Sequence, residues 1–192
     1  LNHAVLSASS AYRWLECPPS ALATADIPDE TTIYAQEGSA AHEMAEYKIR
    51  WHLGAKDLAP PNVGNFNAEE IDRYTDSYAY YATDKIETIR KICPDAIVMV
   101  EQRLDFSNYV KDGFGTGDLV IVADDVLQVI DFKYGKGVTV SAELNPQMML
   151  YALGALNLYG YLYDIKTVKT AIVQPRLDNI SEWEISVDEL LE

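Results

Sequence analysis

The sequence predicts a mixed α/β domain in which a central mixed sheet is flanked by helices. The apolar residues change from a helical to a strand-like period after Pro94. The elements then follow the order helix, helix, three strands, helix, strand, which is typical of a sheet covered by helices. The chain has 192 residues, the length of one domain with a substantial core, so we expect residues 1–192 to form a single domain.

Two helices are expected in the first half of the chain. The first covers residues 37–54 and ends near Gly54, a residue type that favours the position after a helix. The second begins after Asn67, which is suited to cap it, with Glu70 at the capping-box position. Its apolar and aromatic residues recur at helical spacing until Pro94 stops it.

Four strands and a third long helix are expected in the second half. The segments 96–104, 116–123 and 126–133 are rich in β-branched residues, and Asp124-Asp125 predicts a tight turn between the last two. Asn145-Pro146 begins a helix, and residues 167–175 return as a strand. The stretch 147–163 has no charge, but it is shorter than the ~20 residues of a membrane span and contains polar groups. We therefore expect a buried helix.

The charge excludes a general DNA-coating protein. The chain has 15 Lys and Arg against 30 Asp and Glu, a formal net charge of -15. Such a field repels phosphate, although a bound divalent cation reverses the sign locally. Cys17 and Cys93 make no disulfide framework, and no secretory signal pattern opens the sequence, which favours a cytoplasmic protein.

Asp118, Asp131 and Lys133 are the residues with the strongest chemical signal. Residues i and i+2 of a strand share a face, so Asp131 and Lys133 project together. The tight turn can bring Asp118 opposite them. Two carboxylates suit Mg²⁺ or Mn²⁺, and the backbone carbonyl of Phe132 could add a ligand. The alternative is a strand end with a solvated ion pair, which a motif of this length alone would favour.

Three further positions leave two interpretations open. Gln147 and Tyr151 share one face of the uncharged helix. Either Gln147 needs a polar partner, or it caps the helix and Tyr151 belongs to the core. His42 lies on the inward stripe of the first helix, where a core histidine is the commoner outcome. Glu101 is most simply a solvated strand position.

Taken together, these residues resemble the motifs of the PD-(D/E)XK nuclease superfamily, in its RecB-like exonuclease branch, and above all nuclease-like proteins of phages and prophages. The matching segments are EGSAAHE around His42, GTGDLVIV around Asp118, VIDFKYGKG around Asp131 and Lys133, and NPQMMLYALGAL with Gln147 and Tyr151. They occur in the family's order between about residues 37 and 155.

The resemblance implies a restriction-endonuclease-like core and metal-dependent hydrolysis of DNA. It assigns Asp118, Asp131 and His42 to an Mg²⁺ or Mn²⁺ ion, and Lys133 to the attacking water. It assigns Gln147 and Tyr151 to a motif that acts near the DNA backbone, and it gives Glu101 no role.

Cys17 resembles the first of four cysteines that hold an iron–sulfur cluster in several members of this branch. The only other cysteine, Cys93, lies at the end of a helix, so the residues given cannot complete such a cluster. Ser186 and Glu189 form a capping-box pattern, which predicts a helix beginning where the sequence ends. We therefore expect a C-terminally incomplete domain. Either the cluster is absent from this protein, or a full-length chain supplies its other ligands beyond Glu192.

The leading hypothesis is a metal-dependent deoxyribonuclease, an exonuclease serving phage replication, recombination or DNA processing. Its alternatives are a catalytically silent scaffold or binding module of the same fold, which the net charge supports, and hydrolysis of a small phosphate ester. A homo-oligomer or a recombination or replication partner could supply the positive surface that the chain lacks.

Overall fold

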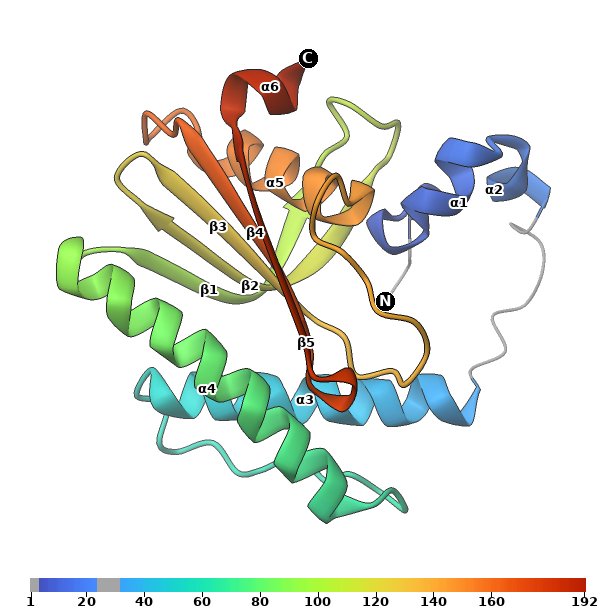
Figure 1. The fold of residues 1–192 in the computed structure, drawn as a ribbon, viewed down its shortest axis with the longest axis vertical. Coiled ribbons are helices and arrows are strands. Elements are labelled where there is room, and N and C mark those ends of the chain that lie inside the picture. The colour runs from blue at the N-terminus through green and yellow to red at the C-terminus, as the bar shows by residue number, and fades with distance from the viewer. Residues whose placement is uncertain (1–3, 24–31) are drawn as a thin grey trace.

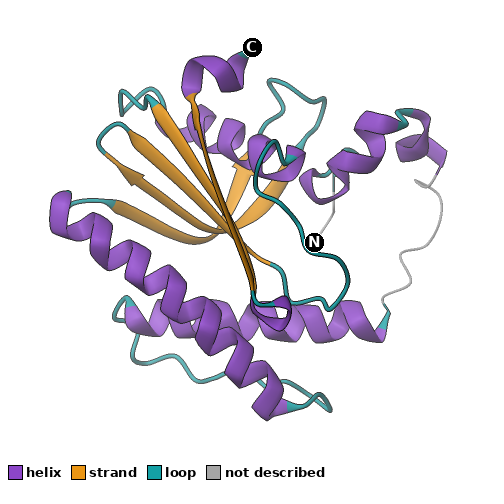
Figure 2. Cartoon of the chain, in the orientation of Figure 1, coloured by secondary structure: helices purple, strands orange, loops and turns teal. Residues whose placement is uncertain are grey.

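The computed structural model describes residues 4–23 and 32–192, and within these ranges five strands form one mixed sheet with helices on both faces (Figures 1 and 2). The helices are α1 (Ala11–Glu16), α2 (Pro19–Ala23), α3 (Ile33–His52), α4 (Ala68–Ile92), α5 (Pro146–Tyr159) and α6 (Val187–Leu191), with short 3-10 helices at Ala8–Ser10 and Pro175–Leu177. The strands are β1 (Ile97–Asp105), β2 (Phe114–Ala123), β3 (Val126–Phe132), β4 (Thr167–Gln174) and β5 (Asn179–Ser186).

The strands lie in the sheet in the order in which they occur in the chain, β1-β2-β3-β4-β5. Neighbouring strands are antiparallel except β3 and β4, which are parallel and are connected through α5. A parallel pair needs such a crossover, whereas the antiparallel pairs close through short turns. The mixed sheet flanked by helices that the sequence predicts is confirmed, and it is consistent with a restriction-endonuclease-like core.

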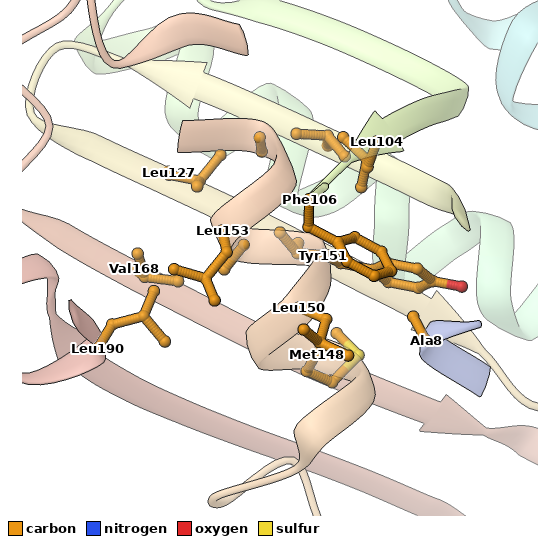
Figure 3. Packing of buried hydrophobic residues seen from close by; sticks show 14 of the residues in the cluster. Ala8, Leu104, Phe106, Leu127, Met148, Leu150, Tyr151, Leu153, Val168 and Leu190 are labelled. Atoms are coloured by element: carbon orange, nitrogen blue, oxygen red, sulfur yellow. The ribbon is translucent and has the colours of Figure 1, made fainter. Parts of the chain in front are cut away.

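The two faces of the sheet bury different halves of the core. On β2, Val120 and Val122 face α5, while Leu119 and Ile121 face α3 and α4. This alternation follows from the two-residue period of a strand. Figure 3 shows side chains of α5 packed over the sheet. The labelled side chains from α5 are Met148, Leu150, Tyr151 and Leu153, and those from the strands include Leu104, Leu127 and Val168. The uncharged stretch therefore forms a buried helix as far as Tyr159, as predicted, whereas residues 160–163 form a turn in which Tyr161 and Leu162 are exposed.

The helix ends follow the predicted signals with two exceptions, the start of α3 and the capping-box role of Glu70. Gly54 takes a φ of +108°, as expected after α3, although α3 begins upstream of residue 37, at Ile33 behind the cap residue Thr32. Asn67 caps α4 by accepting from the Glu70 amide, as predicted. The Glu70 carboxylate instead contacts Arg176, and the reciprocal capping-box bond is not among the contacts of the described residues. Pairing with a charged guanidinium is stronger than a bond to a neutral amide.

Several elements were not predicted from the sequence. Helices α1 and α2 precede residue 37, and β5 forms a fifth strand, antiparallel to β4. The burial of β5 alternates along Asn179–Ser186, but its polar residues give a weak apolar signal. The capping box of Ser186 and Glu189 at the start of α6 is confirmed. Within residues 4–23 and 32–192, no helix has the length and apolar character needed to cross a membrane.

Candidate metal and nuclease site

Asp118 lies where the pairing of β2 with β1 is interrupted and its pairing with β3 ends. The pairing of β1 with β2 skips Glu101 and Asp118, and the pairing of β2 with β3 begins at Leu119 and Ile130. Continued by one residue, the same registers set Asp118 opposite Glu101 on one side and opposite Asp131 on the other. Residues directly opposite each other on antiparallel strands project together. Three carboxyl residues are therefore aligned across β1, β2 and β3.

The Asp118 carboxylate fills the gap in the ladder. Its Oδ2 accepts a hydrogen bond from the backbone amide of Phe132 at 2.6 Å. The next amide, that of Lys133, donates to Val173 on β4, so alternation turns the Phe132 amide toward β2. Asp118 Oδ1 lies 3.2 Å from Nδ1 of His42 on α3. The side chain thus joins the sheet to α3.

His42, Glu101 and Asp118 form an acid–histidine cluster. One ligand atom from each lies within 4.8 Å of the other two, a spacing at which all three could bind one ion. His42 comes from α3, whose inward stripe also buries Ala45 and Ile49. The His42 side chain keeps 37% of its surface exposed, so it lines the site rather than the core. His42 is therefore not enclosed in the core.

Glu101 is the residue of this cluster that the sequence did not reveal. It is half-buried, not a solvated strand position. Its φ of +53° places a non-glycine residue in the left-handed region inside a strand. Such strain is costly and is concentrated at functional sites. A carboxylate in the middle of the apolar strand 97–105 was the available signal, but strand alternation alone could not place it next to Asp118.

The cluster shifts the titration of its own members. Burial alone would lower the pKa of His42, but the charge of Asp118 and its hydrogen bond outweigh burial and raise the pKa to about 9. Burial, followed by the negative charge of Asp118, raises the pKa of Glu101 to about 7. Both groups therefore hold protons more tightly than usual, as expected where carboxylates crowd together without a compensating cation.

A second group, the lysine network, consists of Asp131, Lys133, Gln147 and Tyr151. Lys133 Nζ lies 3.0 Å from Asp131 Oδ2 and donates to Gln147 Oε1 at 2.8 Å. Gln147 Nε2 donates to Asp131 Oδ1 at 2.9 Å and lies 3.2 Å from the Tyr151 hydroxyl. Asn145 caps α5, so the alternative in which Gln147 is the cap is wrong, whereas its second part, Tyr151 in the core, is confirmed.

Asp131 is the most buried acid of the site, with 5% of its side chain exposed. Burial raises its pKa, Lys133 opposes that shift, and the charge of Asp118 adds to it. Its Oδ2 faces the Lys133 ammonium but has no well-directed hydrogen bond from any described residue. A buried carboxylate oxygen in this state retains the capacity to bind a cation.

The predicted residues are thus brought together in two adjoining groups. His42 and Asp118 belong to the acid–histidine cluster, whereas the Asp131 carboxylate is turned toward Lys133 and Gln147. Phe132 contributes its backbone amide to Asp118, and its ring lies 5.1 Å from that of His42. Both cysteines are free, Cys17 exposed after α1 and Cys93 buried after α4, and neither belongs to a ligand cluster of the described residues.

The chain belongs to the family described as "Protein of unknown function (DUF2800)", whose model matches residues 3–192. Among solved structures it is similar to the crystal structure of SSO0001, at 17% sequence identity over 92% of this chain and 77% of that chain, with a TM-score of 0.28. A similarity at this TM-score carries no argument about the site. The function has to be inferred from the geometry.

Proposed function

We propose that this protein is a divalent-metal-dependent deoxyribonuclease of the PD-(D/E)XK superfamily, an exonuclease of the RecB-like branch. The observation that carries the proposal is that Asp118 connects the two groups. It belongs to the acid–histidine cluster, it is bonded to the Phe132 amide beside Asp131, and its charge acts on Asp131 in the lysine network. Packing of the core does not require this many charged groups at one point of a sheet. Clusters of titratable groups with shifted pKa values are typical of functional sites.

The residues fit Mg²⁺ or Mn²⁺. These ions take oxygen ligands, and Mn²⁺ also accepts an imidazole nitrogen. His42 and Asp118, with Glu101 added by the structure, would hold the ion on the α3 side. Asp131 and the Phe132 carbonyl would complete the set from β3. When bound, the ion supplies Lewis-acid stabilisation of the phosphate charge and lowers the pKa of water.

Lys133 is the residue we assign to the attacking water. Its side chain is 30% exposed and its ammonium is fixed by Asp131 and Gln147. From this position it can hold a water in line with a phosphorus atom, and its positive charge favours the hydroxide form. Gln147 keeps the ammonium and the carboxylate in register, and Tyr151 supports Gln147 from the next turn of α5.

The substrate is proposed to be DNA rather than a small phosphate ester. The cavity behind His42, Glu101 and Asp118 leaves no room even for a water molecule. A small ester therefore cannot enter from that side. His42 and Lys133 both keep part of their surface exposed, so a phosphodiester can approach from solvent. We propose action in the cytoplasm, where two free cysteines stay reduced.

The net charge of -15 remains the observation in favour of a catalytically silent scaffold. A bound cation reverses the charge at the site, and a second copy or a recombination or replication partner could add basic surface. If a full-length chain adds ligands beside Cys17, an iron–sulfur cluster would be a separate structural group. The two functions differ in one measurable outcome, the breakage of phosphodiester bonds.

The test is cleavage of linear and circular DNA, single- and double-stranded, with Mg²⁺, Mn²⁺ or EDTA. The wild type should degrade linear DNA only with the cation, and circular DNA should persist if the enzyme is an exonuclease. Asp131→Asn and Lys133→Met should each lose at least about 100-fold in rate while keeping the circular-dichroism spectrum of the wild type. Lys169→Met, which removes a half-exposed ion pair with Glu184, is the control. DNA binding without cleavage under every condition would favour the scaffold.

A further inference from the structure

Tyr78 on α4 carries a buried hydroxyl that the proposed chemistry does not use. The residue is 1% exposed, and its ring stacks on that of Phe132 with centroids 4.6 Å apart. Its hydroxyl has no hydrogen-bond partner among the described residues. A buried hydroxyl without a partner costs free energy, and each such group in a folded protein requires an explanation.

The surroundings of Tyr78 narrow the choice of partner. It lines the same cavity as His42, Glu101 and Asp118, and that cavity has no room for a water molecule. The partner must therefore be a group that already lines the cavity. Burial and the charges of the site's carboxylates raise the pKa of Tyr78 well above its ordinary value. The hydroxyl thus stays protonated and is available as a donor.

Glu101 is the carboxyl group of the cavity wall that has no hydrogen bond among the described residues. The carboxylate of Asp118 is engaged by His42 and by the Phe132 amide. Glu46, another acid of the cavity wall, accepts from Arg50. The Glu101 carboxylate accepts no hydrogen bond from the residues that the structure describes, although the left-handed backbone at Glu101 sets it in the cavity wall.

We propose that Tyr78 is a positioning residue, whose hydroxyl donates a hydrogen bond to Glu101 when Glu101 turns to hold a divalent cation with His42 and Asp118. This inference rests on the proposed metal-dependent function. A donor behind a ligand carboxylate fixes its orientation and stabilises its charged form. Stacking on Phe132 holds the donor in place before the ion arrives, which explains why an unpartnered hydroxyl is retained in the metal-free protein.

The experiment measures Mn²⁺ affinity by isothermal titration calorimetry, and the Tm of the metal-free protein, for the wild type and Tyr78→Phe. Loss of the hydroxyl should raise the Kd for Mn²⁺ by about tenfold or more, the usual effect of losing such a partner. The Tm should stay unchanged or rise, because the hydroxyl has no partner without metal. If Tyr78 served only the stability of the fold, Tyr78→Phe would lower the Tm and leave the Kd for Mn²⁺ unchanged.

Tyr81→Phe is the matched control. Tyr81 lies on the same helix, and its hydroxyl donates to Glu182 outside the site. The control should leave Mn²⁺ affinity unchanged and lower the Tm by about 2–4 °C, since it loses a satisfied hydrogen bond.

A double-mutant cycle with Glu101→Ala identifies the acceptor. The tenfold effect of Tyr78→Phe should vanish in the Glu101→Ala background. An unchanged Kd in Tyr78→Phe, an effect that persists without Glu101, or a Tyr78→Phe protein that unfolds while Tyr81→Phe folds would each overturn the assignment alone. A wild type that binds no Mn²⁺ would overturn the proposed function as well, so the two failures are distinguishable.

Discussion

Gly115 on β2 lies so close to Tyr151 on α5 that a Cβ atom added to it would stand 2.6 Å from Cε1 of the tyrosine ring. The ring in turn supports Gln147, whose amide lies 3.2 Å from the Tyr151 hydroxyl. Gly115 is the first glycine of the GTGD segment that contains Asp118. The glycine thus provides the space in which the lysine network sits against the sheet.

Gly115→Ala is therefore expected to destabilise the protein by about 1–3 kcal/mol, the usual cost of overpacking a core. Urea denaturation measures the change. Gly38→Ala is the matched control, since a Cβ at Gly38 in α3 meets nothing within 4 Å. It should stabilise the protein by up to about 1 kcal/mol through helix propensity. If Gly115→Ala keeps its full penalty in a Tyr151→Ala background, the contact is not the cause.

Gln147→Leu should cost about 1.5–3 kcal/mol in the free energy of unfolding. The substitution removes the hydrogen-bond partner of Lys133 Nζ and of Asp131 Oδ1 and leaves these two charges only their contact with each other at 3.0 Å. Chemical denaturation at neutral pH is the measurement. Asn157→Leu, also on α5 but exposed, removes hydrogen bonds with the neutral Asn108 side chain and the Asp105 carbonyl, and should cost about 1 kcal/mol or less. Equal effects of the two variants would contradict the network.

Arg176→Met should destabilise the protein by about 2–3 kcal/mol. Arg176 is 5% exposed and pairs with Glu37 at 3.3 Å and Glu70 at 2.9 Å, so it ties the first turns of α3 and α4 to the end of β4. Its loss leaves the half-buried carboxylates of Glu37 and Glu70 without their guanidinium partner, and Lys136 still pairs with Glu70 alone. Thermal and urea unfolding both report the change.

The control for Arg176 is Lys166→Met. Lys166 pairs with Asp164 at 2.7 Å, but both side chains are mostly exposed. Exposed ion pairs contribute about 0–1 kcal/mol, so this variant should remain close to the wild type. A similar loss in both variants would show that burial of the Arg176 pairs is unimportant.

The metal-free protein should lose stability as the pH rises from about 6.5 to 9. Burial lowers the pKa of His42, but the charge and hydrogen bond of Asp118 outweigh burial and raise the pKa from 6.5 to about 9. The folded state therefore holds this proton more tightly than the unfolded chain. The resulting stabilisation is complete below pH 6.5 and is lost as the pH passes 9. Urea midpoints in EDTA across this window measure it.

His42→Gln should flatten this pH dependence. The pKa of Glu101 is raised from 4.5 to about 7, so its contribution to stability is lost between about pH 4.5 and 7. The change in stability between pH 7 and 9 is therefore assigned to His42. Identical slopes for the wild type and His42→Gln between pH 7 and 9 would show that the His42–Asp118 contact does not stabilise the folded protein.

The sequence by itself determined most of the secondary structure and the order of the chemical groups. Periodicity, Asn67, Gly54 and Pro94 placed α4 and the end of α3, because these signals act on the local backbone. The turn at Asp124-Asp125 placed β2 beside β3, with Asp118 at the matching end. The fifth strand was missed because its alternating residues are largely polar, and its place depends on pairing with β4.

Only the tertiary structure decided which atoms meet at the site. Glu101 belongs to the acid–histidine cluster, and its own backbone is left-handed. The alternation of residues along a strand, which has a period of two, does not reveal such a conformation. The Glu70 carboxylate pairs with Arg176, which is 106 residues away in the sequence, and not with the amide of the cap residue Asn67. Local signals report interactions between near neighbours in the chain, whereas the partner of a charged side chain is set by whatever the packed sheet and helices bring within a few ångströms.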